Sequence, residues 1–207
     1  MNAEKFLKAE ISYPTRQKLV SAVTRACNDT MKLKDIDQSF DCQKGEETLK
    51  IVRNLKIETQ IRDESQKGLL PFEAIEKRNC ANNCTHYEFN TNGAIITISA
   101  VDMIGGLPRK AKYRENLSLN NQISLFDFEN DFESDFEDKK HILLTHYEEN
   151  GILKGAFLGV PSADGKTWKY NLNLLEELKV IDDVEEKLPN NLLKIRKNII
   201  KEANNNE

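Results

Sequence analysis

The chain has 207 residues and a formal net charge of −4, a length that fits one domain with a sizeable hydrophobic core. Charged residues make up 31% and hydrophobic residues 39%, and no apolar run approaches the about 18 residues that a membrane helix needs, so the sequence predicts no membrane span. The N-terminus has no apolar signal core, and we therefore expect a cytoplasmic protein whose four cysteines are reduced thiols.

Charge is distributed unevenly along the chain. Residues 127–138 hold seven acidic side chains and no basic one, which leaves 27 acidic against 30 basic residues elsewhere. A basic cluster precedes this acidic run and consists of Arg109, Lys110, Lys112 and Arg114. The sequence thus predicts a middle region with a basic part and an acidic part close together.

The N-terminal third has the three- and four-residue apolar spacing of amphipathic helices. Pro14 suits the first turn of a helix, and the apolar positions after it predict a helix over 14–33. A second helical pattern follows residues 41–45, and residues 57–61 fit either its continuation or a strand. Residues 70–79 have Pro71 close to their start, where a proline suits a first turn, and they predict a short third helix.

The middle of the chain changes to strand composition. Two pairs of β-rich segments each surround an Asn-Gly dipeptide, which tolerates the positive φ angles of a hairpin turn. The pairs are 86–89 with 94–101 and 141–145 with 152–160. Two β-hairpins predict a central antiparallel sheet.

The C-terminal part returns to helical patterns. Trp168 and Tyr170 suit one edge of the core, residues 173–180 predict a helix, and Pro189 begins a last one. We expect residues 204–207 to fray. Helices at both ends of a central antiparallel sheet predict an α+β fold, with one domain over 1–203 and a long exposed connection over 105–140.

One short segment of this connection resembles a known docking peptide. Residues Gln122, Ile123, Ser124, Leu125 and Phe126 read Gln-Ile-Ser-Leu-Phe. This is similar to the peptide by which many bacterial replication and repair proteins bind the DNA sliding clamp, usually Gln-Leu-Ser/Asp-Leu-Phe, with Ile123 in place of leucine. The resemblance implies a clamp partner, and it covers five residues. The alternative is that Ile123, Leu125 and Phe126 are core residues.

An acidic and aromatic run follows the docking peptide. On an extended chain, Phe128, Phe132 and Phe136 share one face with Phe126, and the six acidic side chains at odd positions from Asp127 to Glu137 share the other. A helix would also align these phenylalanines, but it would place glutamates four residues apart, where they repel. The run fits an anchor on a basic partner surface, a mimic of DNA phosphates, or a solvated loop packed on its own sheet.

Two further groups of residues are candidate binding sites, one for nucleic acid and one for zinc, and their sequence patterns are less specific than that of the docking peptide. The basic cluster with Tyr113 suits nucleic-acid phosphates and suits equally well ion pairs with the nearby acids. Zinc takes tetrahedral sets of thiolates and imidazoles, and the candidate set is Cys42, Cys80, Cys84 and His86. The spacing of this set is loose, and small buried thiols in the core explain the cysteines as well.

No sequence motif indicates a particular enzymatic reaction. Glu88, Asp102 and Lys110 have the residue types of a metal-dependent nuclease, without a matching spacing. His141 and His146 lie five apart on a predicted strand, hence on opposite faces, which argues against a joint catalytic role. The hypothesis favoured by sequence is an interaction protein of a bacterium, its virus or a mobile element that docks on the sliding clamp and assists or inhibits replication or repair. The alternatives are a nuclease-like enzyme of genome defence or repair and an acidic decoy that competes with DNA.

Overall fold

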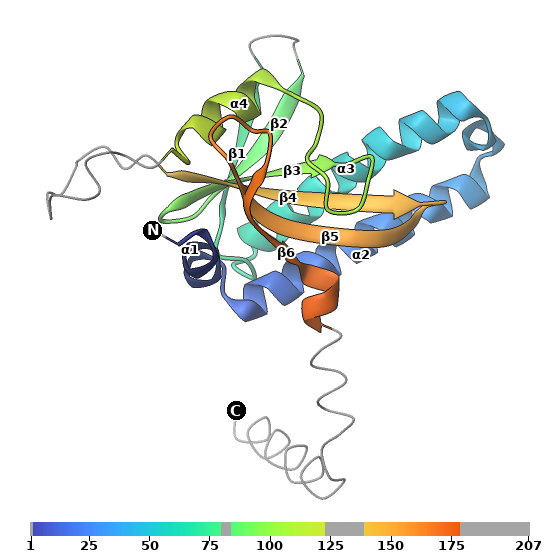
Figure 1. Cartoon of the computed structure of the whole chain (residues 1–207). Helices are drawn as coiled ribbons and strands as arrows, with labels where there is room; N and C mark the ends of the chain where they lie inside the picture. The colour runs from blue at the N-terminus through green and yellow to red at the C-terminus, as the bar shows by residue number, and fades with distance from the viewer. Residues whose placement is uncertain (1, 80–83, 123–138, 179–207) are drawn as a thin grey trace, which may run out of the picture. The chain divides into compact units, whose positions relative to one another are not determined.

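The computed structural model describes residues 2–79, 84–122 and 139–178 (Figure 1). The predictions for Cys80, for residues 123–138, for the helix from Pro189 and for the tail at 204–207 lie outside these ranges. Contacts divide the chain into unit 1, Met1–Leu174, and unit 2, Leu175–Glu207. Of unit 2 only residues 175–178 are described, and they are helical.

Unit 1 contains helices and one sheet, in an α+β arrangement that confirms the predicted class. The helices are α1 (Ala3–Glu10), α2 (Tyr13–Ile36), the 3-10 helix η1 (Gln38–Asp41), α3 (Gln43–Gln66) and α4 (Lys112–Leu119). The strands are β1 (Glu73–Arg78), β2 (Thr85–Asn90), β3 (Ala94–Ala100), β4 (Lys140–Glu149), β5 (Ile152–Pro161) and β6 (Trp168–Asn173). Among the described residues, no helix combines the length and apolar character needed to cross a membrane.

The two long helices follow the predicted patterns. Helix α2 has Pro14 in its first turn, and α3 begins at Cys42, whose sulfur accepts a hydrogen bond from the Gly45 amide at 3.4 Å. Helix α3 continues through the ambiguous residues 57–61, because Ile57 and Ile61 are both buried one helical turn apart. The helical alternative for this segment is therefore confirmed.

The sheet is mixed, so the prediction of a purely antiparallel sheet is wrong. Its strand order is β1-β2-β3-β4-β5-β6, and both predicted hairpins are present, β2 with β3 and β4 with β5. Strands β3 and β4, however, pair in parallel, with Thr97 opposite Leu143. The reason is the long connection between the hairpins, which carries the chain back to the other end of the sheet before β4 begins.

The segment 70–79 is not the predicted helix. It forms strand β1, which pairs antiparallel with β2 so that Ala74 lies opposite Phe89. Leu70 and Phe72 are buried just before the strand, and the residues after Phe72 carry no further helical apolar stripe. Pairing with β2 therefore overrides the local preference that Pro71 suggested.

Part of the predicted exposed connection is also folded. Helix α4 lies within it, and Ser118 and Asn121 are buried. Asn121 donates hydrogen bonds to the carbonyls of His141 (3.0 Å) and Pro161 (2.9 Å) and accepts one from the His141 amide (2.8 Å). Polar contacts rather than an apolar stripe hold α4 on the sheet, and hydrophobic periodicity gave no signal for it.

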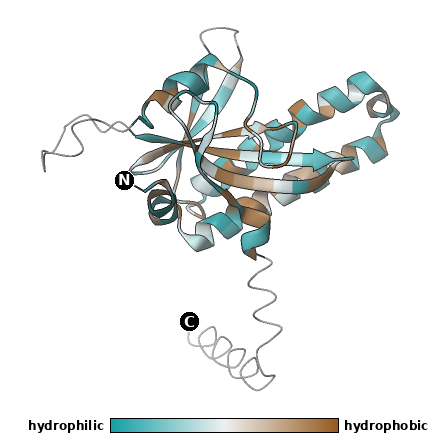
Figure 2. Cartoon of the chain, in the orientation of Figure 1, coloured by the Kyte–Doolittle hydropathy of each residue, from teal (hydrophilic) through white to brown (hydrophobic). Residues whose placement is uncertain are grey.

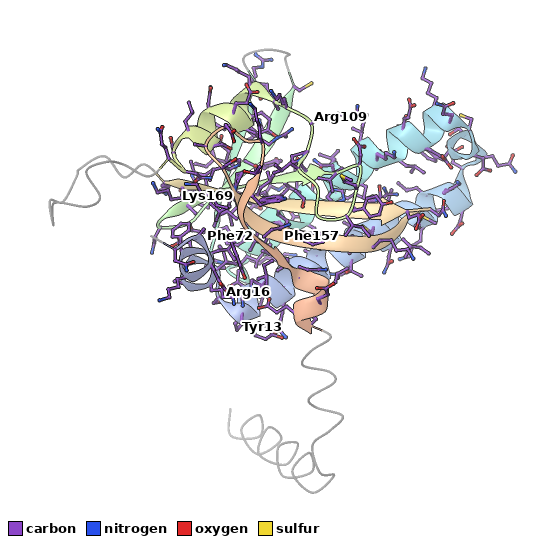
Figure 3. All side chains as sticks on the ribbon, viewed as in Figure 1. Tyr13, Arg16, Phe72, Arg109, Phe157 and Lys169 are labelled. Atoms are coloured by element: carbon purple, nitrogen blue, oxygen red, sulfur yellow. The ribbon has the colours of Figure 1, made fainter. Side chains whose placement is uncertain are left out.

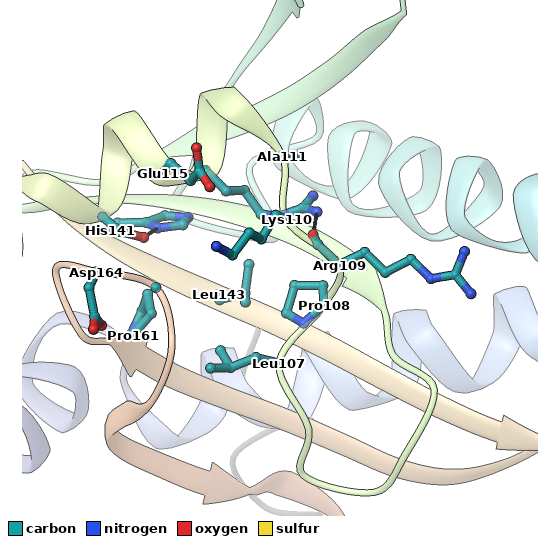
Figure 4. Close-up of a pocket in the computed structure, with 13 residues that line it drawn as sticks. Leu107, Pro108, Arg109, Lys110, Ala111, Glu115, His141, Leu143, Pro161 and Asp164 are labelled. Carbon is teal, nitrogen blue, oxygen red and sulfur yellow. Dashed lines mark hydrogen bonds between the residues drawn. The ribbon is translucent and has the colours of Figure 1, made fainter.

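Alternating side chains of β4 face two different layers. His141 Nδ1 lies 3.0 Å from Ser118 Oγ of α4, whereas His146 Nε2 lies 3.3 Å from Asn54 Oδ1 of α3. The prediction that the two histidines occupy opposite faces is confirmed. Helix α4 accordingly lies in front of the sheet in Figure 4 and the long helices lie behind it. Hydrophobic residues concentrate on the inner strands, and the outer helix surfaces are mostly hydrophilic (Figure 2).

Candidate functional site

A groove of about 820 Å³ lies between α3 and the ends of β2 and β3. These two strands form only two residue pairs, Phe89 with Ile96 and Asn90 with Ile95, and they separate beyond that point. The groove is lined by the separated ends, by one side of α3 and by the segment 109–114 that leads into α4. The sheet is thus open at one place, and both polar and apolar side chains line the opening.

An aromatic pair closes one wall of this α3 groove. The rings of His86 and Tyr113 stack with centroids 3.7 Å apart and an interplanar angle of 24°. Arg114 donates a hydrogen bond to the Tyr113 hydroxyl at 2.6 Å and another to the Arg109 carbonyl at 2.5 Å. His86 Nε2 lies 3.4 Å from Glu88 Oε1. Burial raises the pKa of Tyr113, and the nearby Arg114 guanidinium partly offsets this.

His86 itself is a buried polar residue with spare hydrogen-bonding capacity. Its exposed fraction is 7%, and its Nδ1 finds no hydrogen-bond partner among the described residues. A buried ring nitrogen without a partner costs free energy. Such an atom beside a groove is a candidate for contact with a ligand.

The opposite wall carries a buried carboxyl group. Glu58 of α3 accepts a hydrogen bond from Asn54 Nδ2 at 3.2 Å, and burial raises its pKa to about 7. Burial also lowers the pKa of His146 to about 4, with a further contribution from the Arg53 guanidinium. Near neutral pH His146 is therefore uncharged, and it can donate from Nε2 to Asn54 Oδ1. This orients the Asn54 amide toward Glu58.

Charged groups continue along the sheet-facing side of α3. Arg53 forms a buried ion pair with Glu148 of β4, and Arg53 Nε and Glu148 Oε2 have no further partner within the described part of the chain. Burying charge in this way is costly compared with an apolar contact. Clusters of buried ionisable groups beside a cavity are typical of functional sites.

The predicted basic cluster borders two neighbouring cavities, and Arg109 and Arg114 line both of them. Arg109 and Arg114 line the α3 groove, and Arg109 lies on the segment before α4 (Figure 3), with Nε 3.3 Å from Asp102 Oδ2. Lys110 extends toward His141 and Arg109 extends the other way (Figure 4). Lys112 is exposed at the start of α4.

Lys110 lines only the second, much smaller pocket, which shares Arg109, Ala111 and Arg114 with the groove. This space, between α4, β4 and the turn after β5, measures about 30 Å³, which leaves room for little more than water. Both ring nitrogens of His141 already have partners there, with Nε2 2.9 Å from Thr97 Oγ1 and Nδ1 3.0 Å from Ser118 Oγ. Burial lowers the pKa of His141 to about 3. We assign His141 a structural role.

Of the predicted docking peptide, only Gln122 lies in the described ranges. It is exposed and follows α4 after one turn. Lys140 Nζ donates to the Asn120 carbonyl at 2.8 Å, and Asn120 Nδ2 donates to the Lys139 carbonyl at 3.2 Å. The points where the chain leaves and re-enters the described structure around 123–138 are thus held together. The remaining predicted docking residues, Ile123, Leu125, Phe126, Phe128, Phe132 and Phe136, fall outside the described ranges.

The structure does not bring Cys42 to His86. Cys42 caps the start of α3, sixteen residues before Glu58, which is about 24 Å along a helix; His86 lines the groove near Glu58. Cys84 is exposed, and Cys80 is not described. No three His, Cys, Asp or Glu side chains of the described ranges are grouped to hold a metal ion.

Sequence reasoning missed Asn54 and Glu58. A signal was available, because Leu49, Arg53, Ile57 and Ile61 follow one another at the spacing of a buried stripe and one of them is charged. Comparisons of the chain with protein-family models, with curated proteins and with solved structures find no match.

Proposed function

We propose that this protein docks on the bacterial DNA sliding clamp through residues 122–126 and thereby assists or inhibits DNA replication or repair. The observation that carries the proposal is the Gln-Ile-Ser-Leu-Phe peptide, which begins at an exposed glutamine directly after α4. The hydrogen bonds of Asn120 and Lys140 support it, because they fasten both ends of the segment to the domain. A fastened segment loses less entropy on binding than a free tail.

Such docking depends on only a few side chains. The Gln122 amide both donates and accepts hydrogen bonds, and Leu125 and Phe126 each contribute about 1.5 to 3 kcal/mol when they enter an apolar pocket. Ordering costs reduce this sum, so we expect a dissociation constant on the order of micromolar. A ring-shaped clamp offers several equal sites, and simultaneous occupancy would raise the apparent affinity.

Calorimetry with purified clamp tests the proposal. Replacing Gln122, Leu125 and Phe126 by alanine should abolish binding and leave the melting temperature within about 3 °C of wild type. The matched control is the double variant Asn116→Ala and Leu119→Ala on α4, which removes a neighbouring amide and an exposed apolar side chain and should bind normally. Unfolding of the triple variant would instead assign these residues to the core, and failure of the wild type to bind would refute the proposal.

The two alternatives have less support. Glu88 contacts His86, Asp102 pairs with Arg109, and Lys110 lies toward the small pocket, so the described residues do not assemble the three as a nuclease site. The decoy function depends on the acidic side chains of 127–138, which are not described. It stays a prediction that competition of the protein with DNA weakens when these acids are neutralised.

A further inference from the structure

The rim of the α3 groove carries exposed cations. Lys50 and Arg109 are both exposed and both line the groove. Arg109 pairs with Asp102, but the two side chains are 89% and 72% exposed, and such a surface pair is weak. Its guanidinium can therefore exchange Asp102 for a phosphate, which it binds in a planar two-bond arrangement.

One side of the groove is apolar. Ile51 and Leu55 lie one turn apart on α3, are 72% and 56% exposed, and line the groove together with buried Ile98 of β3. Large apolar side chains on a groove wall favour a flat, partly apolar ligand. A nucleobase has this shape and packs well against such a surface.

The interior of the groove contains polar side chains that can form directional hydrogen bonds. Asn54, Glu58 and His86 line it, and the partnerless Nδ1 of His86 belongs to a residue that is more than nine-tenths buried. Amide, carboxyl and imidazole groups are suited to the donors and acceptors on a base edge. Because these groups are recessed, only an unpaired base can reach them.

We propose that the α3 groove binds single-stranded DNA, with one base between Leu55 and the polar interior and the flanking phosphates at Lys50 and Arg109. The choice of DNA rests on the proposed function. Helix α4 has Tyr113 and Arg114 of the groove at its start and Gln122 just after its end, about 12 Å apart by helix length. A clamp encircles DNA, so a protein docked through Gln122 would hold this groove near the strand.

Acidic side chains limit the strength of this site. Glu47 and Asp102 also line the groove, and they reduce the positive field that Lys50, Arg109 and Arg114 create. We therefore expect weak binding with a modest salt dependence, since two phosphate contacts at about 0.7 each give a logarithmic slope of about 1.4 for a single strand.

Fluorescence anisotropy without any clamp tests the proposal. The probes are a labelled 12-nucleotide single-stranded DNA of mixed sequence, its duplex, and RNA of the same sequence. The double variant Lys50→Glu and Arg109→Glu should weaken single-strand binding at least about 10-fold and lower the salt slope, and Leu55→Ser should weaken it about 5-fold. Lys154→Glu on β5, an exposed position away from the groove lining, should change it less than about 2-fold.

Several outcomes would overturn the proposal. These are no single-strand binding by wild type, equal binding by the double variant, equal or tighter binding of the duplex or RNA, and competition by thymidine monophosphate at the same concentration as the oligonucleotide. The triple alanine variant of Gln122, Leu125 and Phe126 should keep single-strand binding. Its behaviour separates failure of the groove from failure of clamp docking.

Discussion

Glu58 is a buried residue whose ionised carboxyl group lowers the stability of the folded protein. Its carboxyl group faces the α3 groove from a largely buried position, with a pKa of about 7 in the folded protein. A raised pKa means that the folded state binds the proton more tightly than the unfolded chain does. The associated stability is present below the ordinary pKa of 4.5 and is lost as pH rises through about 7.

Replacement of Glu58 by glutamine should therefore stabilise the protein at high pH. Glutamine keeps the acceptor for Asn54 and removes the buried charge, so the free energy of unfolding at pH 8 should rise by about 2 to 3 kcal/mol, with little change at pH 4. Urea titration at both pH values measures this. Glu47→Gln, an exposed position on the same helix, should change stability by less than about 0.5 kcal/mol. A Glu58→Gln protein that is less stable at pH 8 would contradict the assigned burial cost.

Gly151 shows a second effect at the scale of one residue. Gly151 has φ 77° in the β4–β5 turn and Gly68 has φ 71° after α3, so a side chain is strained at both positions. At Gly151 a Cβ would also meet the sulfur of Met31, whereas at Gly68 it would meet nothing within 4 Å.

Alanine at these two glycines should separate conformational strain from steric contact. Gly68→Ala should cost about 1 kcal/mol, and Gly151→Ala should cost about 1 to 3 kcal/mol more, because Met31 must move. Thermal and urea unfolding of both variants give the comparison. Equal losses would mean that Met31 moves aside without cost.

At the scale of elements, α4 joins the two candidate sites. Its start contributes Tyr113 and Arg114 to the α3 groove, and Asn121 just after its end bridges β4 and β5 through three hydrogen bonds. With Asn120 and Lys140 these contacts fix the chain on both sides of residues 123–138. The hydrogen bonds of Asn120 with Lys139 and Lys140 thus join the two flanks of this segment.

Replacing residues 123–138 by a short Gly-Ser linker should preserve the domain. Because the flanking residues are already held together, we expect the melting temperature to change by less than about 4 °C, while clamp binding is lost. The contrasting variant is Asn121→Ala, which leaves buried backbone groups without partners and should cost about 2 to 4 kcal/mol. Circular dichroism during heating measures both. A linker variant that unfolds would show that 123–138 contributes to the core.

At the scale of the whole molecule, buried ionisable groups shape the pH dependence of stability. Burial lowers the pKa of His141 to about 3 and that of His146 to about 4. A lowered pKa contributes stability that is present above the ordinary value of 6.5 and is lost as pH falls toward the folded value. Glu58 acts in the opposite direction between pH 7 and 4.5.

The stability of the wild type should therefore fall by about 1.5 kcal/mol from pH 6.5 to 5, because Glu58 offsets only one of the two histidines, and should fall faster just below pH 4.5. Each histidine lowers stability by up to about 1.4 kcal/mol per pH unit, and Glu58 compensates for one of them until it is protonated in the unfolded chain as well. Urea titrations across this range test the profile. In Glu58→Gln the decline from pH 6.5 to 5 should be about twice as large, because neither histidine is compensated, and a profile identical to wild type would exclude this compensation.

The sequence by itself determined the features that depend on neighbouring residues. Apolar spacing predicted the two long helices, with Pro14 at the start of the first, and the Asn-Gly dipeptides predicted both hairpins, although only Asn150-Gly151 adopts the positive φ angles that were expected. The two-residue period of a strand also placed His141 and His146 on opposite faces. These inferences held because helix periodicity, turn conformation and strand alternation are local properties of the chain.

Only the tertiary structure decided the features that depend on distant residues. Residues 73–78 form strand β1 because they pair with β2. Strands β3 and β4 are parallel because the connection that contains α4 returns to the other end of the sheet. The groove between α3 and the separated strands collects Glu58, His86 and Arg109 from three parts of the chain. No local sequence pattern predicts that these three residues line one groove. Their proximity follows from strand order and helix packing rather than from the structural preference of any one segment.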